Sequence, residues 1–273
     1  LYTGDSATQI LTIDNTVGGS DLIWKAEIHF ELEETELFTA NQHLIQMSSS
    51  DGSGNNQGMS KSGPISMETM SALSGQVNIL SWVTYADMDQ EYLHTLNAIS
   101  QYFTDYRLSS TTITSATVLE EMLDTVDVFL IPEQEYASNS YFENLGASWA
   151  EVLTAFAERG GAIILCGNPS AYNIIDGSGL MHMEYFMPVY SEVLTVEDSM
   201  HYLTEGISGA VLSQDGTFLM SLADSAASNI VSYYDHSVVA HKKVVRGDVV
   251  YIGYDFFNYD DNASRLIAHA VAS

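Results

Sequence analysis

Four short apolar runs, separated by stretches with helical spacing, constrain the fold of this chain more than any other feature. The runs are Val77–Val83, Val126–Pro132, Ala162–Leu165 and Val249–Tyr254, and each is nearly continuous. Such runs are typical of strands that are covered on both faces, as in a parallel sheet. Apolar residues at helical spacing lie between the runs, at Tyr92, Leu96, Ile99 and Phe103 and again at Trp149, Val152, Leu153 and Phe156. The alternation predicts an α/β fold with a doubly wound, mainly parallel sheet.

The first 75 residues have a different pattern and predict two further parts. Two β-rich runs flank a Gly-Gly turn between Ile10 and Leu32, which predicts a β-hairpin appendage within residues 1–47. Residues 48–75 are rich in Gly, Ser and Asn and predict a linker, so the α/β domain is expected over residues 76–273. The hairpin is similar to a strand pair of immunoglobulin-like modules in large secreted bacterial proteins. Because two strands are not stable alone, we expect it to contact another domain or subunit.

The region between Tyr172 and Gly247 carries a weaker pattern. Short β-rich runs, including "MHMEYFMPVYSEV", "GTFLMSL" and "NIVSYY", predict strands and loops. We expect them to form a lid or an additional edge of the sheet.

The charge balance excludes several classes of partner. The 273 residues include 36 Asp and Glu but only 8 Lys and Arg, for a net charge of -28. A chain without a basic stripe repels nucleic acid and anionic lipid, and its field favours cations such as calcium. The base-poor surface predicts an extracellular or cell-surface protein. No apolar run approaches the length of a transmembrane helix, so we expect no membrane insertion.

The single cysteine, Cys166, follows the apolar run Ala162–Leu165 and raises the question of a catalytic thiol. One cysteine forms no internal disulfide, so the fold depends on its apolar core. A nucleophilic thiol needs a nearby base or a helix N-terminus that lowers its pKa. The other interpretation is a small buried side chain that completes a core strand, because free cysteine is among the most buried residue types.

The order of several segments resembles the class I glutamine amidotransferase-like fold. These segments are "VDVFLIPEQE", "AFAERGG", "AIILCG", "HYLTEGISG" and "VVRGDVVYIGYDFFNYDDN", and they extend over most of residues 76–273. The resemblance is greatest to non-amidotransferase members found in extracellular and envelope proteins. It implies a flavodoxin-like α/β domain in which Cys166 takes the position of the family's nucleophile.

The sequence departs from the family's pattern both after the position of the nucleophile and at the position of the catalytic histidine. Residues 167–170, "GNPS", follow Cys166 in place of the family's "C-x-G-x-Q" continuation, and "YDFFNYDD" stands where the family has "H-P-E". The missing histidine argues against glutamine hydrolysis. If Cys166 is a nucleophile, His182 is the best alternative base and Glu133 completes the catalytic set.

Acidic residues also gather in the loops that follow the predicted strands. "PEQEY" places Glu133 and Glu135 after the second apolar run, where parallel sheets bind ligands. "DMDQE", Asp87 to Glu91, follows the first run. The functional interpretation of each set is a catalytic acid or a metal ligand. The structural interpretation is a solvated loop for "PEQEY" and a helix N-terminus, where negative charge is favoured, for "DMDQE".

The closing loop "YDFFNYDDN" provides a specific metal hypothesis. Asp255, Asp260 and Asp261 offer hard oxygen ligands for calcium, without the spacing of an EF-hand. Capping of the final helix by Asp260 or Asp261 is the alternative. No cofactor other than this possible calcium is expected.

Two functions of different classes follow from these observations. The first is a non-catalytic binding or assembly module, with the hairpin contacting other subunits. Clusters among the 16 tyrosines suit a protein or glycan partner, although ordinary core and edge packing explains most of these side chains. The second is a cysteine hydrolase that uses Cys166 on an amide, ester or glycan-linked substrate. The missing histidine favours the first.

Overall fold

The structure is a computed structural model that describes residues 76–273 apart from residues 168–170, 209 and 215. The hairpin predicted between Ile10 and Leu32, with its subunit contact, lies outside the described residues. The linker predicted at residues 48–75 also lies outside them.

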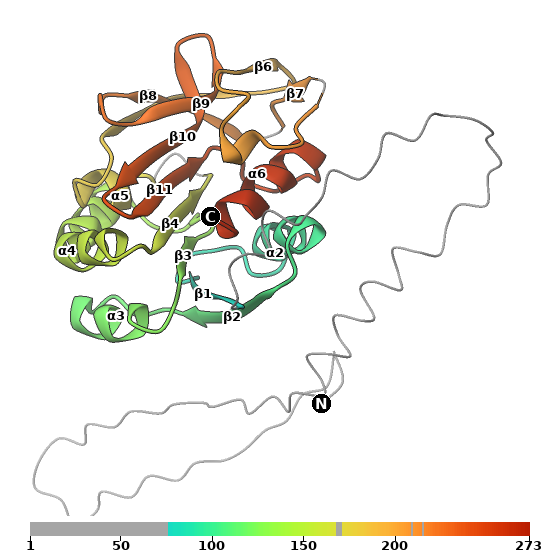
Figure 1. The fold of residues 1–273 in the computed structure, drawn as a ribbon. Helices are drawn as coiled ribbons and strands as arrows, with labels where there is room; N and C mark the ends of the chain where they lie inside the picture. Colours follow the sequence, from blue (N-terminus) through green and yellow to red (C-terminus); the bar gives the residue numbers. More distant parts are fainter. Residues whose placement is uncertain (1–75, 168–170, 209, 215) are drawn as a thin grey trace, which may run out of the picture. The chain divides into compact units, whose positions relative to one another are not determined.

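Five neighbouring strands at one end of the sheet are parallel (Figure 1). Their order is β2 (Tyr106–Thr111), β1 (Val77–Trp82), β3 (Val128–Ile131), β4 (Ala162–Cys166) and β11 (Gly247–Ile252). β1 pairs with β2 and β3, and β4 pairs with β3 and β11, all in parallel. Strands β3, β4 and β11 are buried along their whole length, which explains their continuous apolar sequences. The four apolar runs are thus confirmed as strands.

Two helices, α2 (Glu91–Tyr102) and α6 (Asp261–Val271), pack against each other on one face of the sheet. Their apolar side chains share one buried cluster with the strands. α6 begins at Asp260, whose side chain accepts a hydrogen bond from the backbone N of Ala263 at 2.8 Å. The predicted cap of this helix is therefore confirmed at Asp260.

Three helices contribute to a second buried cluster. They are α3 (Ala116–Leu123), α4 (Asn139–Glu158) and α5 (Asn173–Gly177). Leu80 and Ile163 belong to this cluster, whereas their strand neighbours Ile79 and Ile164 belong to the cluster of α2 and α6. Consecutive strand residues therefore point to opposite cores, as the pleat of a strand requires.

Six antiparallel strands extend the sheet beyond β11 (Figure 1). This antiparallel extension consists of β5 (Met183–Val189), β6 (Val193–Val196), β7 (Val211–Leu212), β8 (Thr217–Leu222), β9 (Ser228–Tyr233) and β10 (His236–Val244), with the short helix η2 (Tyr202–Thr204) between β6 and β7. β10 pairs with β11 and β9, β9 pairs with β6, and β5 joins through β8. The α/β class with a largely parallel central sheet is confirmed, and all six strands of the extension lie in the region between Tyr172 and Gly247 that was predicted as a lid or an additional edge.

Apolar patterning did not reveal β10, for a physical reason. Its nine residues include Lys242 and Lys243, so no continuous apolar run marks it. Both lysines are paired: Nζ of Lys242 lies 2.6 Å from Asp224, and Nζ of Lys243 lies 2.9 Å from Asp248. Because backbone pairing on both sides and these ion pairs satisfy its polar groups, the segment forms a strand in the sheet interior.

The contact between α4 and α5 leaves no room for a side chain at Gly146. A Cβ at this position would overlap the carbonyl oxygen of Ile174, in α5. We predict that Gly146→Ala lowers the free energy of unfolding by about 1–2 kcal/mol, although alanine favours a helix. Urea unfolding measures this change, with Glu143→Ala at an exposed position of α4 as the control. Equal stability of the two variants would contradict the close packing.

Candidate functional site

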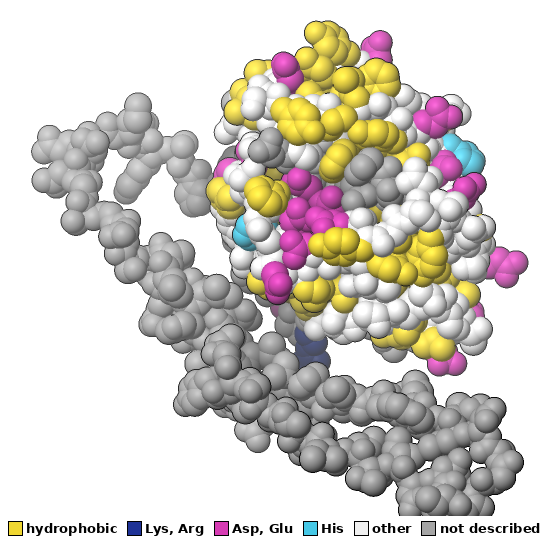
Figure 2. All heavy atoms as spheres, turned by 180° about the vertical axis from the view of Figure 1, so that it is seen from behind, with side chains coloured by type: hydrophobic (Ala, Val, Ile, Leu, Met, Phe, Trp, Pro, Cys, Tyr) yellow, Lys and Arg dark blue, Asp and Glu magenta, His cyan; other side chains and the backbone are white. Residues whose placement is uncertain are grey.

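The loops that follow β1, β3 and β11 meet at the carboxyl edge of the parallel strands. They bring together five carboxylates, those of Asp87, Glu91, Glu133, Glu135 and Asp255, which we call the carboxylate cluster. Parallel strands end at the same edge of a sheet, so loops that are far apart in sequence converge there. Figure 2 shows acidic side chains gathered on one face of the molecule, with hydrophobic side chains around them.

Asp87 organises the loop between β1 and α2. Its Oδ1 accepts hydrogen bonds from the backbone N of Asp89 at 2.9 Å and of Gln90 at 3.3 Å. Its carbonyl oxygen accepts from the backbone N of Tyr92 at 3.0 Å. These bonds start α2 and place Glu91 in the first turn, where the helix dipole favours a negative charge. Asp87 therefore serves the helix start and the carboxylate cluster together.

Gln134 ties the loop after β3 to the loop after β1. Its fully buried side chain accepts a hydrogen bond from the backbone N of Tyr85 at 3.0 Å and donates to the carbonyl of Trp82 at 3.0 Å. The backbone N of Glu135 donates to the carbonyl of Tyr85 at 2.8 Å. This bridge holds Glu133 and Glu135 beside the first loop. Sequence reasoning missed Gln134, because a glutamine between two acids carries no pattern of its own.

Asp255 is held in place where the chain leaves β11. The residue is 8% exposed, and its Oδ1 accepts a hydrogen bond from the backbone N of Phe257 at 2.9 Å. Between them, Phe256 has a φ of 63°, a conformation that favours glycine. Gly216, with a φ of +74°, lies so close that a Cβ there would overlap the carboxylate of Asp255. The turn before β8 therefore fits around Asp255 because residue 216 has no side chain.

Glu91 is the member of the cluster whose pKa is strongly raised. It is 7% exposed, and its Oε2 is buried with no hydrogen-bond partner. Burial raises the pKa of Glu91 to about 8, assisted by a hydrogen bond with Glu135 and by repulsion from Glu135, Asp255 and Asp87. All these influences favour the protonated form, and none comes from a positive side chain. A proton or a cation is therefore needed to stabilise Glu91 at neutral pH.

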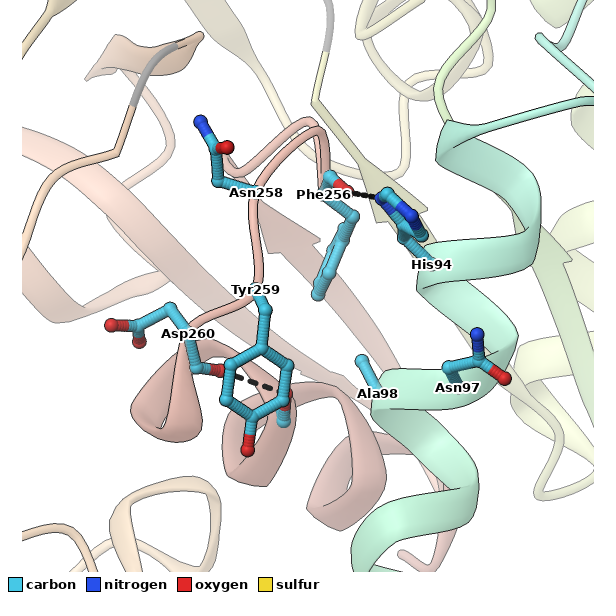
Figure 3. A pocket seen from close by; sticks show the side chains of 8 residues that line it. His94, Asn97, Ala98, Phe256, Asn258, Tyr259 and Asp260 are labelled. Carbon is cyan, nitrogen blue, oxygen red and sulfur yellow. Dashed lines mark hydrogen bonds between the residues drawn. The ribbon is translucent and has the colours of Figure 1, made fainter. Parts of the chain in front are cut away.

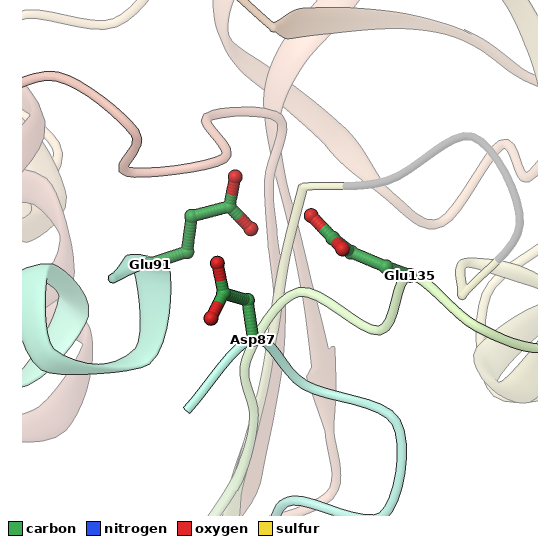
Figure 4. Close-up of side chains that lie close together, drawn as sticks. All are labelled: Asp87, Glu91 and Glu135. Carbon is green, nitrogen blue, oxygen red and sulfur yellow. The ribbon is translucent and has the colours of Figure 1, made fainter. Parts of the chain in front are cut away.

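Two overlapping sets within the cluster have the spacing of a metal site. In Asp87, Glu91 and Glu135, and again in Glu91, Glu133 and Asp255, one oxygen of each residue lies within 4.8 Å of the others. Figure 4 shows the carboxylates of the first set directed toward a common space. Across the described part of the chain, no further group of acidic, histidine or cysteine side chains has this spacing. Carboxylate oxygens are the ligands that calcium and magnesium prefer.

The predicted calcium set of Asp255, Asp260 and Asp261 is divided between two places, which corrects the hypothesis. Asp255 belongs to the carboxylate cluster. Asp260 caps α6, and Asp261 accepts a hydrogen bond from the hydroxyl of Tyr102 and pairs with Nε of Arg265 at 3.3 Å. Asp260 and Asp261 therefore stabilise the start of a helix, the alternative that the sequence had left open.

Cys166 ends β4 as a core residue. Its side chain is 0% exposed and lies in the buried cluster that includes α2 and α6. Burial, and then the charge of Glu133, raise the pKa of the thiol above its ordinary value. Both influences oppose the thiolate that a nucleophile requires. Residues 168–170, which follow Gly167, lie outside the described residues.

His182 occupies a different environment from Cys166. Its Nδ1 lies 3.2 Å from Oδ1 of Asp176, and its side chain is 62% exposed. Within the described residues, no imidazole forms a hydrogen bond with the Cys166 sulfur. Of the predicted catalytic set, Glu133 alone influences Cys166, and its negative charge acts against ionisation of the thiol.

A small cavity lies between α2 and the loop that follows β11 (Figure 3). It has a volume of about 240 Å³ and is lined in part by His94 and Phe256. Nδ1 of His94 donates hydrogen bonds to the carbonyls of Phe256 and Phe257, both at 3.0 Å, because a carbonyl can only accept. This contact connects the helix of Glu91 to the loop of Asp255. None of the five carboxylates lines the cavity.

No protein-family model and no curated protein matches this sequence. Among solved structures, the cytoplasmic protein STM1381 from Salmonella typhimurium LT2 is similar, with a TM-score of 0.51 and 10% identity over 71% of this chain and 98% of that chain. The cytoplasmic protein STM3548 from Salmonella typhimurium has a TM-score of 0.48 and 10% identity over 71% of this chain and 97% of its own. A ThuA-like protein from Parabacteroides merdae ATCC 43184 has a TM-score of 0.48 and 6% identity, over 73% and 90% of the two chains.

These similarities concern the fold alone, because identity is so low. STM1381 supports an α/β fold for most of the described residues. None of the three structures is named as a class I glutamine amidotransferase. The resemblance to that family therefore stays a prediction.

The prediction of an extracellular or cell-surface location is wrong by this comparison. STM1381 is named a cytoplasmic protein. The prediction relied on the scarcity of Lys and Arg, and such a charge balance governs solubility and association rather than location. Along the described part of the chain, no helix combines the length and apolarity needed to cross a membrane.

We predict that the Cys166 thiol reacts slowly with Ellman's reagent in the folded protein and rapidly after unfolding in urea. Burial excludes the reagent, and the raised pKa of the thiol keeps it protonated. Because the chain has one cysteine, the absorbance change reports this thiol alone. Native labelling as fast as labelling of the unfolded chain would contradict the buried position.

We also predict that, without added cations, stability falls as pH rises from about 5 to 8. The folded state holds a proton on Glu91 between its ordinary pKa of 4.5 and its folded pKa of about 8, whereas the unfolded state releases it. The free energy of unfolding therefore decreases over this range, by at most about 1.4 kcal/mol per pH unit.

Glu91→Gln mimics the protonated form, so this variant should show a flatter pH dependence. Urea unfolding in cation-free buffers measures the slope, and Glu151→Gln, at an exposed position of α4, is the control. Identical slopes for the wild type and Glu91→Gln would show that Glu91 is ionised in the folded protein.

Proposed function

We propose that the described part of the chain is a non-catalytic binding module with a doubly wound sheet, whose carboxylate cluster binds a divalent cation, calcium in particular. The observation that carries this proposal is the buried carboxylate of Glu91. Its Oε2 has no hydrogen-bond partner, and the charged groups that influence its pKa are all negative. Such a group is stable when protonated or when it ligates a cation. Because the proton leaves near pH 8, a cation can replace it under ordinary conditions.

The composition of the two sets favours a hard cation. Both sets consist of carboxylates and include no imidazole or thiol. Zinc and copper prefer nitrogen and sulfur ligands, whereas calcium, magnesium and manganese prefer oxygen. Calcium accepts six to eight oxygens in flexible geometry, while magnesium requires a near-ideal octahedron. Carboxylates that come from three separate loops suit the more tolerant ion.

A cysteine hydrolase has less support. Its nucleophile would be a thiol with no exposed surface and a raised pKa, and its predicted base is paired with Asp176. No hydrogen bond connects Cys166 to a histidine in the described residues. Catalysis by this thiol would require both its burial and its protonation to change.

The surroundings of the cluster support a binding role. Met88, Tyr136 and Phe257 lie next to cluster residues in sequence or two positions away, and they are 45%, 69% and 44% exposed. Exposed aromatic side chains around a polar centre suit a protein or glycan partner. Contact with other subunits through the N-terminal hairpin stays a prediction, as does the identity of the partner.

Calcium titration by isothermal calorimetry tests the proposal. We expect saturable binding to EDTA-treated, dialysed protein at pH 7, with heats that vary with the ionisation enthalpy of the buffer because binding releases the Glu91 proton. The melting temperature should rise, and free calcium at 100 times Kd should stabilise the fold by about 2.7 kcal/mol. Glu91→Gln should weaken binding by about tenfold or more.

Asp261→Asn is the matched control, because it removes a carboxylate from the same acidic loop but outside the cluster. This variant should bind calcium as the wild type does. Absence of binding to the wild type at millimolar calcium would refute the proposal. So would loss of binding in Asp261→Asn together with unchanged binding in Glu91→Gln.

A further inference from the structure

We infer that the carboxylate cluster holds two divalent cations, with Glu91 as the ligand that bridges them. This inference rests on the proposed function. It assigns Asp87 and Glu135 to an outer site, and Glu133 and Asp255 to an inner site, with Glu91 common to both.

Geometry favours two sites over one. Ligand oxygens on opposite sides of one calcium ion lie about 4.8 Å apart, twice the usual calcium–oxygen distance of about 2.4 Å. Within each set of three residues, the oxygens lie within 4.8 Å of one another, so each set can surround one ion. The two sets share Glu91 and no other member, and the five residues do not form one larger set of this spacing. A single ion therefore cannot contact all five carboxylates.

Charge balance leads to the same result. Five ionised carboxylates carry five negative charges, of which one divalent cation balances two and two divalent cations balance four. Among the described residues, the groups that influence Glu91 are all negative, so a cation beside Glu91 would relieve this repulsion. Burial makes the charge of Glu91 costly without a cation, because this residue is 7% exposed and its Oε2 has no hydrogen-bond partner.

Glu91 has the position that a bridging ligand needs. It is the residue that both sets share, and its Oε2 is buried without a hydrogen-bond partner. Figure 4 shows its carboxylate opposite those of Asp87 and Glu135. A bridging carboxylate uses both oxygens, one for each ion, which accounts for a buried acid whose oxygen makes no hydrogen bond.

Two glycines leave room beside the inner carboxylates. A Cβ at Gly167 would lie 3.1 Å from Oε2 of Glu133, and a Cβ at Gly216 would overlap the carboxylate of Asp255. Both glycines have positive φ, +34° and +74°. The three residues of the inner site are each at most 8% exposed, whereas Glu135 of the outer site is exposed. The inner ion should exchange slowly, and the outer ion should keep positions open to water or to an oxygen ligand from a partner.

Calcium stoichiometry tests this inference on the full chain. Calorimetry and equilibrium dialysis with calcium should give two ions per wild-type chain. Glu135→Gln should remove the outer ion and leave one, Asp255→Asn should remove the inner ion and leave one, and Glu91→Gln should weaken both. Asp261→Asn should retain two. Unfolding curves in the absence of calcium show whether each variant folds, and Glu133→Gln replaces Asp255→Asn if that variant does not.

The outcomes separate this inference from the proposed function. One ion per wild-type chain would overturn the two-ion site and leave the cation-binding module intact. No bound ion would overturn both. Two ions in the wild type, with the same ion lost in Glu135→Gln and Asp255→Asn, would overturn the assignment of separate sites.

Discussion

Repulsion among carboxylates that the parallel sheet brings to one edge is the constraint on which the rest of this site depends. β1, β3 and β11 run in the same direction, so the acidic loops that follow them converge. Among the described residues, hydrogen bonds to backbone groups stabilise this edge. Asp87 accepts from the first turn of α2, Gln134 joins two loops, and Phe257 donates to Asp255. These bonds hold the loops together, while the buried Oε2 of Glu91 has no hydrogen-bond partner and is available to a cation.

The environment at this edge of the sheet is unfavourable for a nucleophilic thiol but favourable for carboxylates that bind a cation. Cys166 lies at the end of β4, between β3 and β11, where both faces of the sheet are covered. Burial there stabilises the core and raises the pKa of the thiol, and the charge of Glu133 raises it further. For a carboxyl group, burial and negative neighbours also favour the neutral form, but a divalent cation relieves both effects at once. The environment that disables a nucleophile therefore suits a cation site.

Sequence patterns predicted much of the fold and each piece of the site separately. The four apolar runs became β1, β3, β4 and β11, and Asp260 caps α6 as one alternative required. The acidic loops after β1 and β3 and the acid at Asp255 were each recognised as candidates. The sequence did not predict that these residues form one cluster, because Asp255 was grouped with its sequence neighbours Asp260 and Asp261. The strand β10 was missed because paired lysines interrupt its apolar pattern.

The sequence by itself determined the buried strands β1, β3, β4 and β11 and the amphipathic helices between them, because side-chain periodicity records the burial of each element locally. It also determined a strong excess of negative charge. Only the tertiary structure decided that Asp87, Glu91, Glu133, Glu135 and Asp255 share one edge while Asp260 and Asp261 begin a helix. The reason is physical: desolvation and charge repulsion act through space, and a residue's neighbours in space are set by the packing of distant elements.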